Sequence, residues 1–241
     1  MRYAVFADIH SNLEAWQAVF GALKQERIDQ FICVGDIVGY GADPRKCTNL
    51  IEALKPLTVA GNHDQAVVGK LDISYFNINA REAILWTKEK LAQANRDYLA
   101  SLELVQNRDD FILVHGSLDN PEEFKYILDI DSAGPSLELL EKSKKTILFV
   151  AHSHRPFVLV EKGNYLPGEF LKLPGDLNYI INVGSVGQPR DGDWRACYAL
   201  YDSEKNTIEF KRIKYDVETT RKKIIKAGLP RILADRLMIG R

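Results

Sequence analysis

The sequence predicts a single α/β domain over residues 1–241, and three observations lead to that fold class. Short apolar or β-branched runs bounded by turn residues predict buried strands within the first 151 residues. The earliest of these runs alternate with helical patterns, as in an open α/β sheet. From Phe157 onward, short runs separated by Gly, Pro and Asn predict a second, largely antiparallel sheet.

Composition places the chain among ordinary globular proteins. Apolar residues make up 46% and charged residues 27%, and 32 basic minus 33 acidic side chains leave a net charge of −1. This balance excludes intrinsic disorder, collagen and a membrane bundle. A near-neutral chain also lacks the basic field that gives non-specific affinity for nucleic acid, so we expect no stable nucleic-acid complex.

The cysteines and the first residues predict a cytoplasmic protein. Cys33, Cys47 and Cys197 are odd in number, lie far apart and form no CxxC pair, which argues against a disulfide framework and a zinc knuckle. The apolar stretch at the N-terminus is too short for a signal peptide, and no run reaches the length of a membrane span. We therefore expect buried, reduced thiols.

The first part of the chain predicts strands joined by helices. Ser11 and Glu14 follow the first strand and are spaced as a capping box at the start of a helix. Asp43 and Pro44 form an N-cap and first-turn pair that predicts a second helix, running toward Leu54. The expected strands in this part are 3–7, 31–34, 57–60, 111–114 and 146–151.

The remaining segments predict outer helices and the second sheet. Residues 78–104 carry helical spacing with almost no breakers and predict a helical excursion between the third and fourth strands, suited to a lid or outer layer. Residues 217–237 predict a helical tail, whose basic string RKKIIK is expected to be a solvated face. The second sheet is expected to contain strands at 157–163, 168–173, 177–183, 195–202 and 207–215.

All five histidines lie at the end of an expected strand or within three residues of it. In an open α/β sheet, the carboxyl ends of the strands line the crevice that binds ligands. One such histidine would be ordinary, but two aspartates and an asparagine accompany them at successive strand ends. The set consists of Asp8, His10, Asp36, Asn62, His63, His115, His152 and His154.

These side chains suit a pair of divalent metal ions. Imidazole nitrogens, carboxylates and an amide oxygen without thiolate fit Mn, Fe, Co, Ni or Zn, and a bridging carboxylate can hold two ions about 3.5–4 Å apart. Asp8 and His10 are two positions apart, so at a strand end both can reach the same ion. His152 and His154 repeat this spacing. Such a pair of ions generates hydroxide at neutral pH.

In their order, these strings resemble the motifs of the calcineurin-like metallophosphoesterases, which are D-x-H, G-D, G-N-H-D/E, H and G-H-x-H. The resemblance covers Asp8 to His154, and the later string GSVGQPRDGDWR resembles a loop of the bacterial phosphodiesterase-like branch. It implies a four-layer α/β/β/α sandwich, in which two mixed sheets face each other with helices outside. It also implies two divalent ions per chain, Mn²⁺ or Fe first, with Zn, Ni, Co or Mg as further options.

The same resemblance implies a role for each residue of the set. The first ion would be held by Asp8, His10 and His154, the second by Asn62, His115 and His152, and Asp36 would bridge the two. His63 would stay free of metal and act as general acid or charge stabiliser beside the leaving group.

Departures from the family pattern at two places bear on the site. Ala151 replaces the usual Gly before the last histidine pair, and its small side chain should leave ligation intact after a slight backbone adjustment. Gly39 and Tyr40 stand where protein Ser/Thr phosphatases of this superfamily have an Asp and an Arg, which counts against a protein phosphatase. That Asp normally orients the catalytic histidine, here His63, and Asp64 is the nearest substitute.

Phosphate oxygens that point away from the ions need further donors. Asn12, Arg155 and Arg190 are the candidates for substrate binding. Each has an ordinary alternative, because Asn12 could be an early helical residue, Arg155 a surface guanidinium and Arg190 part of an ordered turn. Tyr40 could stack on a base or cap the core.

The expected function is hydrolysis of a phosphodiester or nucleotide-type substrate, with metal-bound hydroxide attacking in line and no covalent enzyme intermediate. A phosphomonoesterase or protein phosphatase with the same site is a second hypothesis. A non-catalytic, metal-binding interaction scaffold is a third, and the presence of all seven ligand positions together with His63 argues against it. The expected partner is a small-molecule phosphate ester, while the substrate, the native metal and the oligomeric state stay open.

Overall fold

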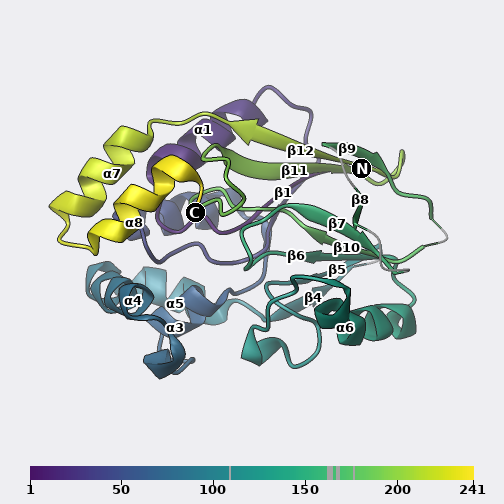
Figure 1. The fold of residues 1–241 in the computed structure, drawn as a ribbon, viewed down its shortest axis with the longest axis horizontal. Helices are drawn as coiled ribbons and strands as arrows, with labels where there is room; N and C mark the ends of the chain where they lie inside the picture. Colours follow the sequence, from purple (N-terminus) through teal and green to yellow (C-terminus); the bar gives the residue numbers. More distant parts are fainter. Residues whose placement is uncertain (109, 162–164, 167–168, 176) are drawn as a thin grey trace.

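Two six-stranded sheets lie face to face in the computed structural model, which describes all residues except 109, 162–164, 167–168 and 176 (Figure 1). The first sheet consists, in spatial order, of β3 (Leu57–Thr58), β2 (Gln30–Cys33), β1 (Arg2–Phe6), β11 (Ala196–Asp202), β12 (Thr207–Ile213) and β9 (Phe170–Lys172). The second consists of β4 (Val105–Asn107), β5 (Phe111–Val114), β6 (Ile147–Val150), β10 (Tyr179–Asn182), β7 (Phe157–Val160) and β8 (Tyr165–Leu166). Both sheets are mixed, and helices cover their outer faces, so the expected four-layer sandwich is confirmed.

The strands are not divided between the sheets in the order of the chain. The expected strands at 111–114 and 146–151 belong to the second sheet, whereas the late strands β11, β12 and β9 complete the first. The expectation of a separate, late, antiparallel sheet is therefore wrong. Hydrophobic runs show that a strand is buried but do not show which neighbour it pairs with. The expected strands at 157–163 and 168–173 also extend to positions 162–163 and 168, outside the described residues.

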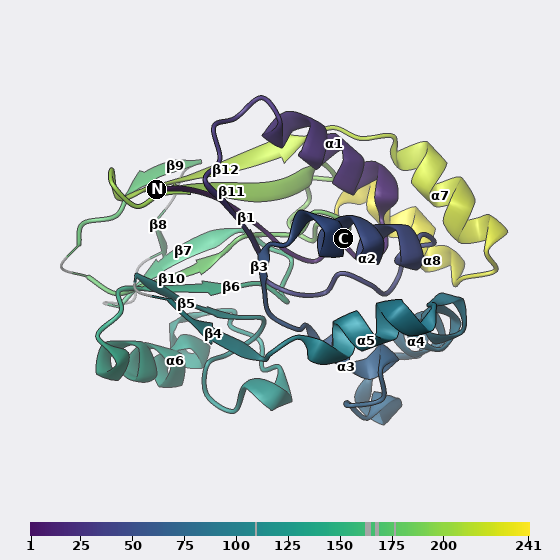
Figure 2. The same ribbon diagram turned by 180° about the vertical axis from the view of Figure 1, so that it is seen from behind.

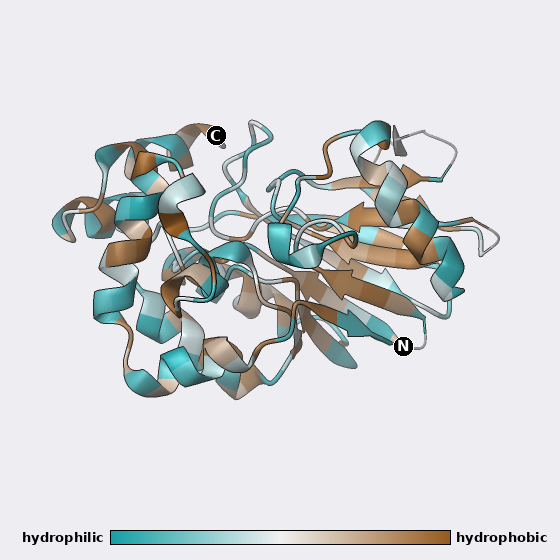
Figure 3. Ribbon diagram, turned by 90° about the horizontal axis from the view of Figure 1, so that it is seen from below, coloured by the Kyte–Doolittle hydropathy of each residue, from teal (hydrophilic) through white to brown (hydrophobic). Residues whose placement is uncertain are grey.

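Alternate residues of β1 pack into two different cores. Ala4 and Phe6 face α1 (Leu13–Leu23), where the rings of Phe6 and Trp16 lie 4.7 Å apart. Tyr3 and Val5 face the second sheet. Because both faces of the strand are covered, its sequence is a continuous apolar run rather than an alternating one. Figure 3 shows the same feature as brown strands in the middle of the molecule.

The two outer helical layers pack on the sheets through apolar side chains. Helix α2 (Pro44–Leu54) lies with α1 on the first sheet and contributes Cys47 and Ile51 to the same core. Helix α6 (Ile130–Ser143), which the sequence patterns did not predict, covers the second sheet through residues such as Leu140. The three cysteines are free and buried, as expected.

Helix α1 begins differently from the sequence expectation. Asn12 is its N-cap, because the Asn12 side chain accepts a hydrogen bond from the backbone N–H of Ala15 at 3.1 Å. Ser11 precedes the cap with a positive φ of 55°, so the predicted Ser11–Glu14 capping box is wrong. Helix α2 starts after Asp43, as expected, but the Asp43 carboxylate contacts lysine side chains rather than the helix N-terminus.

The expected helical excursion is present as two helices, α4 (Ile78–Lys90) and α5 (Gln93–Ser101). They follow α3 (Asn62–Val67) and the short turn η1 (Ile73–Tyr75). Figure 2 shows this group beside α2 and the C-terminal helices α7 (Val217–Lys226) and α8 (Arg231–Asp235). Ala83 of α4 and Leu233 of α8 belong to one apolar cluster, which joins the excursion to the tail.

The basic tail is partly used for structure. Lys223 of α7 forms ion pairs with Glu14 and, at 2.6 Å, with Asp43, so it fastens the tail to the starts of α1 and α2. Over the residues that the structure describes, no helix is both long enough and apolar enough to span a membrane.

The connection from β10 to β11 passes from the second sheet to the first and rests on the loop after β1. Within it, the Gly187 N–H donates to the Asp8 carbonyl at 2.8 Å, and the Gly187 carbonyl accepts from the Asn12 side chain at 2.8 Å. A Cβ atom at Gly187 would lie 1.9 Å from the carbonyl oxygen of Ile9. Only glycine therefore allows the two loops to approach so closely.

We expect Gly187→Ala to lower the free energy of unfolding by about 1–3 kcal/mol, because the two backbones must separate to admit the methyl group. Gly134→Ala is the control, since that position is inside α6 and an added Cβ meets nothing within 4 Å. The free energy of unfolding of the control should rise by about 0.5–1 kcal/mol, because Ala has a higher helix propensity than Gly. Urea unfolding measures both, and a Gly187→Ala protein as stable as the original would contradict the close approach.

Candidate metal centre

The expected ligands come from strand ends of both sheets. Asp8 and His10 follow β1 and Asp36 follows β2, and these two strands are parallel neighbours in the first sheet. His115 follows β5 and His152 follows β6, which are parallel neighbours in the second. Because the two sheets are stacked, the carboxyl ends of both strand pairs open onto one place.

Left-handed backbone conformations concentrate in these loops. Asp8, His10, Asp36, His152 and His154 all have positive φ, between 47° and 66°. This region is disfavoured for residues with a Cβ, and each instance costs about 1–3 kcal/mol unless the surroundings enforce it. The conformation turns both members of each i, i+2 pair toward the same point. Ala151 is not among the residues with positive φ, so the usual glycine is not needed there.

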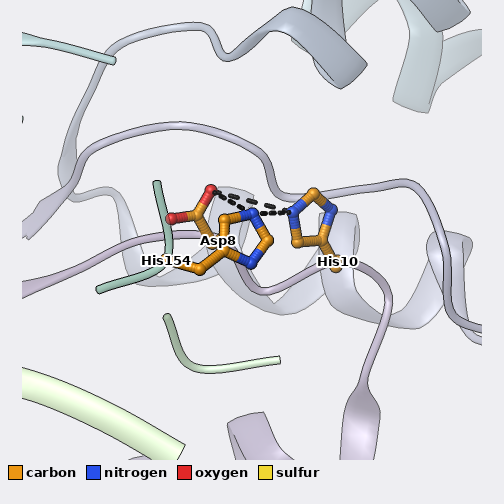
Figure 4. Close-up of side chains that lie close together, drawn as sticks. All are labelled: Asp8, His10 and His154. Atoms are coloured by element: carbon orange, nitrogen blue, oxygen red, sulfur yellow. Dashed lines mark hydrogen bonds and ion pairs between the residues drawn. The ribbon is translucent and has the colours of Figure 1, made fainter. Parts of the chain in front are cut away.

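One group of side chains consists of Asp8, His10 and His154, which are buried (Figure 4). The Nε2 atoms of His10 and His154 lie 3.7 and 3.5 Å from the same Asp8 oxygen, Oδ1. The two Nε2 atoms are 3.1 Å apart. Figure 4 shows the carboxylate and both rings directed at one another, as three ligands of one ion would be.

Asp36 connects this group to a second one. Its Oδ2 atom lies 3.6 Å from His10 Nε2 on one side and 3.3 Å from His115 Nε2 on the other. His152 completes the second group with Asp36 and His115. A carboxylate between two groups of imidazoles is where a bridging ligand would stand.

Backbone carbonyls fix the orientation of three of the imidazoles. The Nδ1 atoms lie against the carbonyl oxygens of Val38 for His10 at 3.0 Å, of Val34 for His115 at 2.6 Å and of Gln188 for His154 at 2.6 Å. A nitrogen next to a carbonyl oxygen must donate its hydrogen. Each ring therefore presents the lone pair of Nε2 to the cluster, which is the arrangement typical of metal-binding histidines.

The buried atoms without partners test whether these residues fit metal ions. Five such atoms are buried and accept no hydrogen bond from any residue that the structure describes: both carboxylate oxygens of Asp8, Oδ2 of Asp36, Oδ1 of Asn62 and Nε2 of His115. Buried acceptors are rarely left unpaired in proteins because losing water without a substitute is costly. Here the unpaired acceptors are nitrogen and oxygen atoms at one point, and divalent cations satisfy such atoms.

Burial also sets the protonation of the cluster. It lowers the pKa of His10, His152 and His154 well below the ordinary value, so these imidazoles are neutral at neutral pH and able to ligate. Burial raises the pKa of Asp8 above its usual range. Burial alone would also raise the pKa of Asp36, but the surrounding imidazoles hold it below its usual range.

A cavity of about 470 Å³ opens above the cluster, and Asp36, Asn62, His152 and His154 contribute to its lining. This volume is in the range of small-ligand sites. Arg190 also lines the cavity. Its guanidinium bonds Gln188 Oε1 at 2.8 Å and the Tyr40 hydroxyl at 3.4 Å, and it lies over the Tyr40 ring. Among the described residues Arg190 has no carboxylate partner, so its charge is available to an anion.

His63 lines the same cavity but is held differently from the expected ligands. Its ring packs on Tyr40, with the centroids 4.4 Å apart, and its buried Nδ1 atom has no hydrogen-bond partner. A side chain at Gly39 would lie 2.4 Å from this atom. Position 39 must therefore be glycine for the ring to occupy this place. His63 also lies close enough to His10 and Asp36 to share a group of possible ligands with them.

Asp64 does not orient His63, which corrects the expectation. Its carboxylate accepts hydrogen bonds from the backbone N–H groups of Ile37 at 3.0 Å, Val38 at 3.2 Å and Gly61 at 3.1 Å. Asp64 therefore ties the loop after β2 to the start of α3. It supports Asp36 and His63 through the backbone rather than through the imidazole.

Asn12 and Arg155 are also placed differently from the expectation. The amide of Asn12 is used by the cap of α1, by the Gly187 carbonyl and by the Thr220 hydroxyl, and the residue lies outside the large cavity. Arg155 is exposed and donates to the Arg190 carbonyl at 3.0 Å. Neither side chain reaches the cavity, so of the three expected phosphate donors only Arg190 does.

Sequence reasoning missed two contributors to the site. The ring of Tyr126 stacks on His152 with centroids 3.9 Å apart and planes 16° apart. Ser185 donates its hydroxyl to the Asp8 carbonyl at 2.9 Å and so supports the first ligand loop. Neither belongs to a metal motif, and the only local signal for Tyr126 was an aromatic residue soon after His115.

Residues 1–182 match the family model described as calcineurin-like phosphoesterase. The chain belongs to this family. An uncharacterized protein of Methanocaldococcus jannaschii, MJ0912, is 42% identical over 248 residues, which cover 99% of this chain and 98% of that protein. The crystal structure of a metallophosphoesterase from Sphaerobacter thermophilus is 36% identical with a TM-score of 0.88, covering 100% of this chain and 99% of that one. The hypothetical protein PH1004 of Pyrococcus horikoshii shares the fold, with a TM-score of 0.81 at 22% identity over 100% and 98% of the two chains.

The family and the ligand groups together make this protein a metal-dependent phosphoesterase. The family match therefore favours an enzyme over the non-catalytic, metal-binding scaffold. The seven expected ligands and His63 each belong to a ligand group or line the cavity.

We expect Asp36→Asn to reduce the content of both ions in this phosphoesterase, because one carboxylate lies between the two groups of ligands. Elemental analysis after dialysis against limiting metal measures the ions per chain. Asp131→Asn, at the exposed start of α6, is the matched control and should keep the original content. Loss of one ion with full retention of the other would show that Asp36 does not bridge.

Proposed function

We propose that this phosphoesterase binds two divalent ions and hydrolyses small-molecule phosphodiesters at least as well as phosphomonoesters. The observation that carries the proposal is the convergence of buried, unpaired acceptor atoms from both sheets beside an open cavity. A hydrolase needs both features, because the reacting phosphate must reach the groups that activate water.

The ligands divide between the two ions as the family motifs imply. The family resemblance favours Mn²⁺ or Fe, and the donor set also accommodates Zn, Ni, Co or Mg. When bound, such a pair of ions supplies a nucleophile at neutral pH and stabilises the charge that develops on the phosphoryl group. The proposed ligands are Asp8, His10 and His154 for one ion, Asn62, His115 and His152 for the other, and Asp36 for both.

Arg190 binds the phosphate in this proposal. Its guanidinium is held by the neutral side chains of Gln188 and Tyr40 and lines the cavity beside His154. A guanidinium held in place without a neutralising carboxylate is suited to pair with non-bridging phosphate oxygens.

In this proposal, His63 is the general acid that protonates the leaving group. Burial lowers the pKa of His63 to about 4, although the charge of Asp36 acts in the opposite direction. The ring is therefore uncharged in the protein without substrate and must take up a proton before it can act as a general acid; the negative charges of Asp36 and of a bound phosphate ester both favour that uptake. Lining the cavity without a hydrogen bond to Asp64, it is free to donate to the leaving oxygen of the ester.

The surroundings of the phosphate favour a diester. A diester carries one negative charge on its phosphate, whereas a monoester carries up to two near neutral pH. Among the described residues that line the cavity, Arg190 is the only cation. Protein phosphatases of the superfamily have an Asp and an Arg where this chain has Gly39 and Tyr40, and the ring of His63 leaves no room for a side chain at position 39.

Other features support a cytoplasmic enzyme made of one domain. Cys33, Cys47 and Cys197 are free and buried, as in a reducing compartment. Strands from the two ends of the chain meet in the first sheet, where β1 pairs with β11, and this supports one domain over residues 1–241.

We expect bis-p-nitrophenyl phosphate to be hydrolysed with a kcat/KM at least equal to that of p-nitrophenyl phosphate, assayed with Mn²⁺ at neutral pH. The two esters release the same leaving group, so the comparison isolates the effect of the second alcohol and of the phosphate charge. A clear preference for p-nitrophenyl phosphate or for phosphoserine peptides would instead support a phosphomonoesterase.

We expect His63→Ala and His63→Asn to lower kcat by about 10²–10⁴-fold while both ions and the urea unfolding midpoint are retained. The loss should be smaller for diesters that release p-nitrophenolate than for those that release an alkoxide, because a stable anion gains little from protonation. Loss of metal in these variants, or equal rate losses for good and poor leaving groups, would contradict this role.

A further inference from the structure

Two segments wall the outer half of the cavity, beyond the metal ligands and Arg190. One is 71–77, which contains η1, and the other is 122–126, which follows the start of η2 (Pro121–Glu123). In Figure 1 the first lies below α3 and the second between α3 and α6. They are distant in sequence, and both contribute residues to the one cavity.

Each segment is fixed to the site by a phenylalanine. The ring of Phe76 meets His63 edge to face at 5.4 Å, and the ring of Phe124 meets His115 edge to face at 6.1 Å. Such pairs hold their partners in a defined geometry. The two walls are thereby positioned relative to the residues proposed for catalysis.

Each segment also presents a tyrosine to the cavity. Tyr75 is 91% exposed and makes no ring contact with another described residue. Tyr126 lies flat on His152 and is still 46% exposed. Exposed aromatic rings beside a phosphate site are the surfaces on which the flat ring of a base stacks.

The charges of the outer half are opposite to that of Arg190. Asp72 and Glu122 line the cavity and form no ion pair within the described part of the chain, while Glu123 is paired with Lys125 at 3.0 Å. The cavity therefore has a cation beside the metal ligands and, at its outer end, two carboxylates without an ion pair, of which that of Asp72 also accepts hydrogen bonds from Ser74. A second phosphate placed at that end would be repelled, whereas amino groups would find acceptors.

We propose that the outer half of the cavity binds a nucleobase, with Tyr75 and Tyr126 stacking on the ring and Asp72 and Glu122 accepting hydrogen bonds from its N–H groups. The substrate class is then a nucleoside ester with a single phosphate, and dinucleoside polyphosphates are disfavoured. The proposal rests on the proposed function for the position of the phosphate. The whole cavity, at about 470 Å³, has room for a nucleoside with its phosphate and is large for the smaller choline cation, which aromatic rings and carboxylates also attract.

Binding of nucleosides without phosphate tests the aromatic walls independently of catalysis. Calorimetric titration of the full chain with adenosine and cytidine should show saturable binding that Tyr75→Ala and Tyr126→Ala each weaken about tenfold or more. Phe170→Ala, a change at a ring 63% exposed on β9, is the control and should bind as the original does. Absence of nucleoside binding, equal affinity in the tyrosine variants, or binding of choline in place of nucleosides would overturn the proposal.

A kinetic comparison separates this proposal from the proposed function. The p-nitrophenyl diesters of adenosine 5′-phosphate and of methyl phosphate release the same phenolate and differ only in the second alcohol. The kcat/KM of the adenosine ester divided by that of the methyl ester should fall about tenfold in the tyrosine variants. If neither ester is hydrolysed while nucleosides still bind, the proposed function fails and the base site stands. If both are hydrolysed at an unchanged ratio, the base site fails.

The roles of Asp72 and Glu122 are tested by comparing a substrate that has one phosphate with a substrate that has several. The original protein should hydrolyse the p-nitrophenyl ester of adenosine 5′-phosphate in preference to diadenosine tetraphosphate. The double variant Asp72→Asn with Glu122→Gln should show this preference reduced by several-fold. Added salt should also reduce the preference in the original protein. Glu89→Gln, an exposed change on α4, is the control. An unchanged preference in the double variant would overturn the role of the two acids.

Discussion

Buried carboxylates and imidazoles whose lone pairs face one another are stable together only when a cation joins them, and this constraint dominates the junction of the two sheets. Among the described residues, neither carboxylate oxygen of Asp8 has a hydrogen-bond partner, and Asp36 has none for Oδ2. The fold holds Oδ1 of Asp8 and Oδ2 of Asp36 within 4 Å of imidazole nitrogens. Left-handed backbone at Asp8, His10 and Asp36 is part of the free energy that this arrangement costs.

The backbone, rather than other side chains, supplies most of the support for the ligands. Three of the imidazoles are oriented by main-chain carbonyls, two from the stretch after β2 and one from the connection between β10 and β11, and Asp64 accepts hydrogen bonds from three main-chain N–H groups around the loop of Asp36. Because the supporting atoms belong to the strand-end loops themselves, the geometry of the ligands follows from the geometry of the sheets. Preorganisation of this kind reduces the rearrangement that ion binding requires.

The proposed metal ligands could be selected from sequence because ligand type and i, i+2 spacing are local properties. His10 and His154 are recognisable by their chemistry and by the strands that precede them. The roles of polar residues nearby were not predictable in the same way. Asn12 and Asp64 carry groups that suit phosphate binding or catalysis, yet their side chains satisfy backbone atoms that only the folded chain brings near.

Local sequence patterns also did not show which of the two sheets each strand belongs to. A run such as that of β11 shows burial, but its pairing with β1 depends on competition among all the strands of the chain. The same limit applies to Tyr126, which reaches His152 through a loop without periodicity. Pairings between distant segments, rather than the propensity of each segment, decide these features.

The pairing of β1 with β11 has a consequence for how the protein is made. Tyr3 is paired with Tyr201, so one edge of the first strand has no partner until nearly the whole chain has left the ribosome. The loop carrying Ser185 and Gln188, which supports Asp8 and His154, lies in the same late stretch. The nascent chain therefore carries an open strand edge and an unfinished ion-binding loop through most of its synthesis, the stage at which association with other chains and binding of the wrong metal compete with folding. Contacts of such long sequence separation also make folding slow, so this exposure continues after release of the chain.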